Sequence, residues 1–106
     1  MPERPILITG ASGFVAAYLL PRLAAAFPDR ALIRCGAGLT PLDVTDAAEV
    51  AALVAREQPE FCVHLAAISA VPVARKDPDL AWRVNLHGSL NLARSILAHA
   101  PGCTLL

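Results

Sequence analysis

The chain has 106 residues, 56% of them apolar, and nine basic and nine acidic residues give a formal net charge of zero. This length corresponds to one domain, and the apolar fraction suits a packed core and excludes a disordered segment. The charge balance favours neither nucleic acid nor an anionic membrane as a partner. Because the sequence shows neither a signal-peptide pattern nor an apolar run of the roughly 20 residues of a membrane span, we expect a cytoplasmic protein.

Short apolar runs alternate with helical patterns from the N-terminus onward. Residues 5–9 are predicted to form a buried strand that ends at Gly10. Residues 13–26 have a helical pattern, in which Pro21 requires a kink or a solvent-facing position. Residues 31–34 form a second short strand in this interpretation.

The middle of the chain continues the alternation. Residues 35–38 are predicted as a loop from their glycine content, and residues 39–44 as a third short extended segment. Asp46 and Glu49 have the spacing of a capping box, which opens a helix that Pro59 stops.

The second half begins with a continuous apolar run at residues 61–67, which is typical of a central strand in a parallel sheet. Asp77 is a suitable N-cap, with Pro78 as the first helical residue of a long helix that reaches about Ala100. The apolar stripe expected on this helix consists of Leu86, Leu90, Ala93 and Leu97.

Strands that alternate with helices imply right-handed βαβ units, and hence an α/β fold with a parallel sheet of about four to five strands flanked by helices. The fifth strand begins at about Cys103, and the chain stops at Leu106 inside it. We therefore expect residues 1–106 to be the N-terminal portion of a partial Rossmann fold, truncated at the fifth strand. The run at 61–67 would then lie near a sheet edge, which favours pairing with a second copy and a homo-oligomer.

The cysteines and histidines predict neither disulfides nor a metal site. The chain has three cysteines, at Cys35, Cys62 and Cys103. Their odd number and wide spacing predict reduced, mostly buried thiols. His87 and His99 are twelve residues apart (99 − 87) and point in different directions on a helix. These two and His64 are better explained as satisfied core or surface residues than as ligands.

A glycine-rich turn between the first strand and the first helix carries the chemistry. Residues 9–16 read Thr-Gly-Ala-Ser-Gly-Phe-Val-Ala, a Gly-x-x-Gly-x-x-Ala spacing. Glycines permit a tight turn and close approach to a pyrophosphate, and the helix N-terminus offers free N–H groups. Such turns also occur for tight packing alone, but the position at the first βα turn favours dinucleotide binding. The expected contacts are Gly10, Ser12, Gly13, Phe14 and Val15.

Four motifs in order resemble the extended short-chain dehydrogenase/reductases, also described as the NAD(P)-dependent epimerase/dehydratase family. They are the turn at 9–16, the third-strand motif at 42–46, the fourth-strand motif at 64–67 and the helix at 82–92. The resemblance covers essentially the whole chain. It implies that Asp43 meets the adenine ring, although a plain loop acid is the alternative, and that the fourth-strand motif lies against the cofactor ribose. The further cofactor contacts implied are Asp43, Val44, Leu65, Ala66 and Ala67.

Residues 66–71, followed by Asp77 and Pro78, look most like the nucleotide-sugar branch, such as the GDP-mannose 4,6-dehydratases and GDP-4-keto-6-deoxymannose reductases. This resemblance implies a nucleotide-sugar substrate, provided that a C-terminal part completes the fold. Ser69 would lie near the substrate and Asn85 near the nicotinamide. Capping of a loop turn by Ser69, and local satisfaction of Asn85, are equal alternatives.

The form of the cofactor is indicated by Arg34. A carboxylate at the end of the second strand bonds the ribose 2′-hydroxyl of NAD, whereas an arginine accommodates the 2′-phosphate of NADP. Arg34 follows Gly10 by 24 residues (34 − 10), close to the expected spacing of about 20. NADP is therefore favoured and NAD remains possible, with a solvated strand-end arginine as the alternative.

No catalytic residue is assigned. The resemblance implies a Tyr-x-x-x-Lys pair, but the single tyrosine, Tyr18, is followed four residues later by Arg22, and the single lysine is Lys76. The chain alone is expected to be inactive. Two alternatives stay open: a non-catalytic, self-associating α/β module with a degenerate cofactor loop, and a mononucleotide or phosphate binder that uses only the turn.

Overall fold

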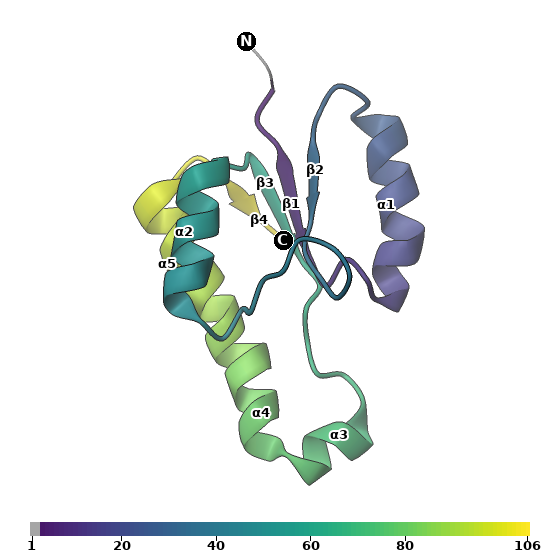
Figure 1. The fold of residues 1–106 in the computed structure, drawn as a ribbon, viewed down its shortest axis with the longest axis vertical. Coiled ribbons are helices and arrows are strands. Elements are labelled where there is room, and N and C mark those ends of the chain that lie inside the picture. Colours follow the sequence, from purple (N-terminus) through teal and green to yellow (C-terminus); the bar gives the residue numbers. More distant parts are fainter. Residues whose placement is uncertain (1–2) are drawn as a thin grey trace.

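The computed structural model describes residues 3–106 and has the expected α/β architecture (Figure 1). Its sheet has four strands in the order β2-β1-β3-β4, and every pairing is parallel. The strands are β1 (Ile6–Thr9), β2 (Leu32–Arg34), β3 (Phe61–His64) and β4 (Thr104–Leu105). All four residues of β1 are buried, which suits a strand between two parallel neighbours.

Helices connect consecutive strands across both faces of the sheet. Helix α1 (Phe14–Ala26) lies on one face, whereas α2 (Ala47–Glu57) and α5 (Gly88–His99) pack together on the other (Figure 1). Pro21 is exposed within a continuous α1, one of the two outcomes expected for it. None of the helices in residues 3–106 is long and apolar enough to cross a membrane.

The third connection is a long helical arm. It comprises α3 (Val71–Lys76), α4 (Pro78–Trp82), a π-helical turn η1 (Arg83–His87) and then α5. The predicted start is confirmed, because the Asp77 side chain accepts a hydrogen bond from the Leu80 N–H at 3.0 Å. Helix α3 was not expected from the sequence.

Two expected extended segments are corrected. Residues 39–44 form no strand; only an isolated bridge joins Cys35 to Thr40, because the chain turns back through Gly38 at φ +74°. Strand β3 ends at His64 and does not reach residue 67. From there the N–H groups of Leu65 and Ala66 donate to the buried hydroxyl of Thr9, and Leu65 keeps a longer backbone bond, at 3.3 Å, to the Thr9 carbonyl.

The expected apolar stripe on the long helix is wrong. Leu97 is 73% exposed and Leu86 is also exposed, whereas α5 buries a different set against α2 and the sheet. The buried residues of α5 are Gly88, Leu92, Ser95 and Ile96. The buried face includes a glycine and a serine, which a search for apolar residues passes over. The stripe of leucine and alanine residues therefore indicated the opposite face of the helix.

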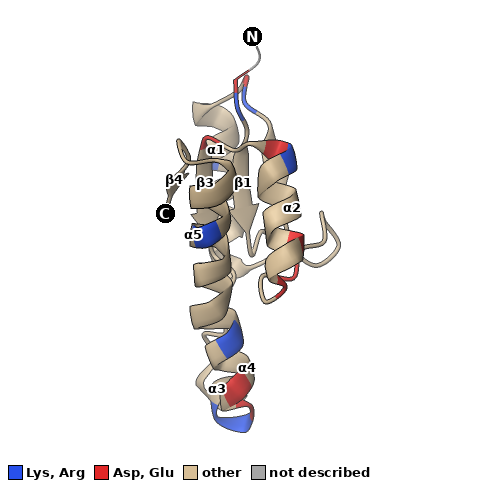
Figure 2. Cartoon of the chain, turned by 90° about the vertical axis from the view of Figure 1, so that its left-hand side faces the viewer, with Lys and Arg blue, Asp and Glu red and all other residues tan. Residues whose placement is uncertain are grey.

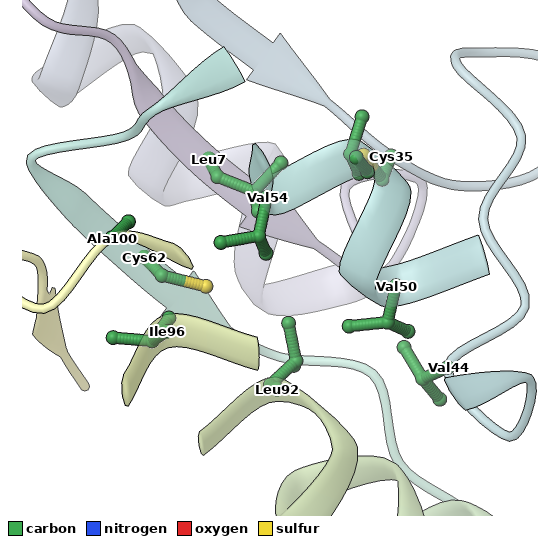
Figure 3. Packing of buried hydrophobic residues seen from close by; sticks show 10 residues of the cluster. Leu7, Cys35, Val44, Val50, Val54, Cys62, Leu92, Ile96 and Ala100 are labelled. Carbon is green, nitrogen blue, oxygen red and sulfur yellow. The ribbon is translucent and has the colours of Figure 1, made fainter. Parts of the chain in front are cut away.

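Side chains that alternate along β1 build a core on each face of the sheet. Leu7 points toward α2 and α5, into a cluster with Cys35, Val54, Cys62 and further residues (Figure 3). Ile6 and Ile8 point toward α1. The expected burial of most thiols is confirmed: Cys35 and Cys62 are buried and Cys103 is partly buried. Burial raises the pKa of Cys35 to about 11 and that of Cys62 to about 12.

Candidate dinucleotide-binding site

The carboxyl ends of β1, β2 and β3 meet at one edge of the sheet, where their loops lie together (Figure 1). Ligands of open parallel α/β sheets bind outside this edge. The three loops contain most of the residues that the sequence pointed to.

The turn after β1 is built around Gly10. Its φ of +63° is a left-handed conformation that favours glycine. A Cβ atom at Gly10 would lie 2.7 Å from the backbone nitrogen of Ala66 and 2.7 Å from the carbonyl carbon of Leu65. The N–H of Gly13 donates to the carbonyl of Gly10 at 3.0 Å and closes the turn. The first turn is therefore in direct backbone contact with the segment after β3.

Helix α1 starts directly from this turn with an uncapped N-terminus. Gly13 is its N-cap residue and makes no side-chain cap bond, and the first turn holds no acidic residue. Phe14 and Val15 are 79% and 57% exposed. The first N–H groups of a helix have no partner inside it, and its dipole is positive at this end. This end of α1 therefore fits an anion such as a pyrophosphate.

The loop after β2 lies against the same turn. The N–H of Ala11 donates to the carbonyl of Cys35 at 2.9 Å, and a Cβ at Gly36 would meet the Ser12 hydroxyl oxygen at 2.9 Å. Arg34, which ends β2, is exposed and forms no ion pair within residues 3–106. Its guanidinium is free to meet a ligand beside the turn. Gly36 could not be identified from the sequence, because its role depends on this close contact.

Asp43 and Val44 have different surroundings. The exposed Asp43 carboxylate accepts hydrogen bonds from the Thr45 N–H at 2.9 Å and the Thr45 hydroxyl at 2.6 Å, which hold its pKa below the usual value. Val44 is buried in the core, and its carbonyl accepts from the Asn91 side chain at 2.9 Å. Of these two residues, Asp43 therefore presents a polar side-chain group at the surface and Val44 does not.

Only one of the two hydrogen bonds of a capping box forms at the start of α2. Asp46 accepts from the N–H of Glu49 at 3.1 Å, as its spacing predicts. The Glu49 carboxylate accepts from the N–H of Asp43, also at 3.1 Å, and not from that of Asp46. The second bond therefore fixes the backbone of the loop that carries Asp43.

The side chain of Thr9 fixes the backbone of the segment after β3 by hydrogen bonds. Its buried hydroxyl oxygen accepts from the N–H of Leu65 at 3.0 Å and from that of Ala66 at 3.1 Å. The same oxygen lies 2.6 Å from Nδ1 of His64. Leu65 and Ala66 are half-buried beside Gly10, and Ala67 is exposed. The motif at 64–67 and the glycine turn therefore form one hydrogen-bonded unit.

The side chain of Asn85 makes two hydrogen bonds to the backbone of the loop that follows this segment. Its Oδ1 accepts from the N–H of Ile68 at 2.7 Å, and its Nδ2 donates to the carbonyl of Ile68 at 3.0 Å. The neighbouring Ser69 is exposed. Asn85 lies in the π-helical turn η1, a feature that often marks functional sites. Its side chain is thus satisfied locally, and it positions the exposed backbone around Ser69.

A shallow apolar hollow of about 410 Å³ adjoins this loop. It lies on the helical arm and is lined by residues of α3, α4 and η1. Trp82 lines it and is 64% exposed, so it does not pack the helix against the sheet. Asn85 lies at the boundary between the hollow and the loop. Within residues 3–106, no group of three or more metal-ligating side chains is assembled.

Residues 6–105 match the model of the NAD dependent epimerase/dehydratase family. A dTDP-4-dehydrorhamnose reductase of Streptomyces griseus is 38% identical over 105 residues, which are 99% of this chain and 33% of that protein. A GDP-6-deoxy-D-mannose reductase of Pseudomonas aeruginosa is 33% identical over 101 residues, 95% of this chain and 32% of that protein. This chain thus spans about a third of the length of these relatives.

Solved structures give the same result for the fold. A dTDP-4-dehydrorhamnose reductase from Bacillus anthracis, in complex with NADP, superimposes with a TM-score of 0.83 at 28% identity. The match covers 97% of this chain and 35% of that one. The Rossmann-type α/β fold and the resemblance to nucleotide-sugar enzymes expected from the sequence are therefore confirmed.

Proposed function

The chain belongs to the NAD dependent epimerase/dehydratase family, and on that premise we propose that it is the dinucleotide-binding part of a nucleotide-sugar reductase, dehydratase or epimerase, with NADP(H) as the preferred cofactor. The observation that carries the proposal is the Gly10 turn, in which a left-handed glycine opens an uncapped helix with an exposed, acid-free first turn. Similar relatives named as reductases of dTDP- and GDP-linked sugars support the substrate class.

In this proposal, the backbone of the turn and the N-terminus of α1 bind the pyrophosphate, and Ser12 and Gly13 let it approach closely. The segment Leu65–Ala67 lies along the ribose, and the Asp43 carboxylate meets the adenine. The bound nicotinamide would supply hydride transfer, for which these residues provide binding and orientation. Val44 contributes through its backbone, because its side chain lies in the core.

Arg34 supports NADP over NAD. It ends β2 beside the turn, is exposed, and has no ion-pair partner in the described part of the chain. An arginine fork matches a phosphate group with two parallel hydrogen bonds. The 2′-phosphate is the group that distinguishes NADP from NAD at this point of the fold.

The 106 residues contain no Tyr-x-x-x-Lys sequence, so we assign no proton donor. A nucleotide sugar would bind with residues that a C-terminal part supplies. Ser69 would face it from this side, on a loop that Asn85 positions through its bonds to Ile68. The chain by itself is expected to show no NADPH-dependent reduction of a keto-sugar nucleotide. Clear turnover by the purified chain would contradict this assignment.

A pair of substitutions at Val15 tests the turn. An acid in the first turn of a helix stabilises it by about 0.3–1 kcal/mol through the dipole, but the same charge repels a pyrophosphate. Val15→Glu should therefore raise the melting temperature of the free chain slightly and abolish its stabilisation by NADPH. Val15→Gln is the neutral control of equal size and should keep the NADPH response. Equal responses of the two variants would exclude the turn as the pyrophosphate site.

A further inference from the structure

The buried network beneath the glycine turn has a fixed hydrogen-bond direction. Thr9 Oγ1 has two lone pairs, and the N–H groups of Leu65 and Ala66 occupy both. The Thr9 hydroxyl hydrogen must then be donated to the remaining neighbour, Nδ1 of His64, which lies 2.6 Å away. Nδ1 is therefore an acceptor and carries no proton.

The other side of the ring completes the assignment. A neutral imidazole with a bare Nδ1 carries its proton on Nε2. Nε2 lies 3.1 Å from the hydroxyl oxygen of Ser89, whose own hydrogen is donated to the carbonyl of Asn85 at 2.8 Å. The chain of bonds thus runs from the segment after β3 through β1 to the π-helical turn, and every group in it is satisfied.

We propose that His64 is a positioning residue for the cofactor turn: as the neutral Nε2–H tautomer it accepts the Thr9 hydroxyl bond that fixes Leu65 and Ala66 against Gly10, and its protonation lowers cofactor affinity. This inference rests on the proposed function. A protonated imidazole is a donor at both nitrogens. Its Nδ1–H would face a hydroxyl oxygen with no free lone pair, so one of two bonds to this oxygen must break. Either Ala66 loses its bond, or Leu65 keeps only its longer bond, at 3.3 Å, to the carbonyl of Thr9.

The contact between Gly10 and the segment after β3 is too tight to accommodate such a change. The α-carbon of Gly10 already faces the backbone of Leu65 and Ala66 so closely that a Cβ would lie 2.7 Å from both. A shift of that segment therefore displaces the turn that meets the pyrophosphate. Burial also lowers the pKa of His64, which keeps the ring neutral at physiological pH.

Few titratable groups lie on the elements that pack around the ring. Strand β1 carries none. The N–H of His64 donates to the main-chain oxygen of Leu106 at 2.8 Å, and no hydrogen bond or ion pair joins the ring to a charged side chain of residues 3–106. The titratable residues on β3 itself, directly before β4, on η1 and on α5 are Cys62, Cys103, Arg83, His87, Arg94 and His99.

The first test is made without ligand. Long-range ¹H–¹⁵N correlation spectra of the purified chain at pH 7.5 should show His64 with a bare Nδ1 and a protonated Nε2. On lowering the pH to 5, the amide signals of Gly10 and Ala66 should follow the titration of the His64 ring. A predominant Nδ1–H tautomer, or Gly10 and Ala66 amides that ignore the titration, would overturn the inference.

The second test measures the dissociation constant of NADP⁺ between pH 7.5 and 5 for the wild type, His64→Asn and His87→Asn. NADP⁺ is used because NADPH decomposes in acid. Asparagine keeps an acceptor near the Nδ1 position and does not titrate. The 2′-phosphate of the ligand titrates with a pKa of about 6, but its effect on the dissociation constant is the same for all variants and cancels in their ratio. His87 is an exposed histidine outside the network and serves as the matched control.

Below the pKa of His64, the ratio of wild-type to His64→Asn dissociation constants should rise by up to about tenfold per pH unit. The His87→Asn variant should follow the wild type. Identical profiles for wild type and His64→Asn would overturn the inference. Absence of NADP⁺ binding at pH 7.5 would instead overturn the proposed function, while the amide titration still decides whether His64 controls the turn.

Discussion

At the scale of single residues, the candidate site depends on side chains that are absent or very small. Gly10 brings the first turn into backbone contact with Leu65 and Ala66, and Gly36 brings the second loop against Ser12. The sequence motif identified Gly10 because its spacing is regular. It could not identify Gly36, since a glycine in a loop shows no pattern until its neighbours are known.

Two glycines with similar backbone angles allow the contact at Gly10 to be measured. Gly38 has φ +74° but no atom within 4 Å of a Cβ placed there. Gly38→Ala should cost about 1–2 kcal/mol of unfolding free energy from the left-handed backbone alone. Gly10→Ala should cost at least about 2 kcal/mol more, because the methyl group overlaps backbone atoms.

Urea denaturation of both glycine variants and the wild type gives these values. Equal losses at the two positions would contradict the close approach of the turn to the segment after β3.

Arg34 decides the choice of cofactor in our proposal. Hydrogen bonds to charged groups contribute about 1.5–3 kcal/mol, which corresponds to roughly a tenfold to hundredfold change in affinity. Arg34→Gln should weaken NADPH binding by that factor and leave NADH binding almost unchanged. Arg94→Gln, an exposed arginine on α5, removes the same charge away from the turn and should change neither. Calorimetric titration checks both, and equal weakening of NADPH and NADH would refute the role of Arg34.

At the scale of elements, the sequence predicted the strands and the main helices because their signals are local. Apolar runs, the Asp46 and Asp77 caps and the Gly10 turn all lie within a few residues of the structure that they specify. The boundary of β3 was placed too late because Thr9, distant in sequence, takes the hydrogen bonds of Leu65 and Ala66. Residues 39–44 pair with no strand of the sheet, and this lack of a partner cannot be recognised from the local sequence.

Helix α5 shows how a small residue can define the packed face. A Cβ at Gly88 would lie 2.8 Å from Cγ2 of Val44. Alanine is favoured over glycine inside a helix by about 1 kcal/mol, whereas overpacking costs about 1–3 kcal/mol. Gly88→Ala should therefore be neutral to destabilising by about 2 kcal/mol in the wild-type background.

The same substitution should become stabilising when Val44→Ala provides the space. A double-mutant cycle from thermal or urea unfolding measures this change of sign. If Gly88→Ala stabilises the chain equally in both backgrounds, the contact between α5 and the loop before α2 is not as close as described.

At the scale of the whole molecule, the two faces of the sheet are covered unequally. Helices α2 and α5 cover one face, and α1 covers part of the other (Figure 1). Beside α1 an entirely apolar groove of about 210 Å³ runs along Phe27, Phe61 and Val63 to Leu106, which is 84% exposed. Charged residues of both signs are scattered over the helices in Figure 2, and the Arg30 guanidinium lies over the rings of Phe27 and Phe61.

We therefore predict that the purified 106-residue chain self-associates through the β4 edge and this groove. Light scattering coupled to size-exclusion chromatography should show dimers or larger species at concentrations of about 100 µM. Leu106→Lys should shift the chain toward the monomer. Leu97→Lys, on the exposed face of α5, is the control and should not. A wild-type monomer at all concentrations would contradict the prediction.

The central claim is that a dinucleotide binds across the loops after β1, β2 and β3. The most direct measurement is a titration of the ¹⁵N-labelled chain with NADPH, followed through its backbone amide signals. We predict that the largest shifts fall at residues 10–16, 34–36 and 65–67, and that NADH produces a weaker response without the shift at Arg34. Shifts confined to the hollow beside Trp82, or no shifts at all, would contradict it.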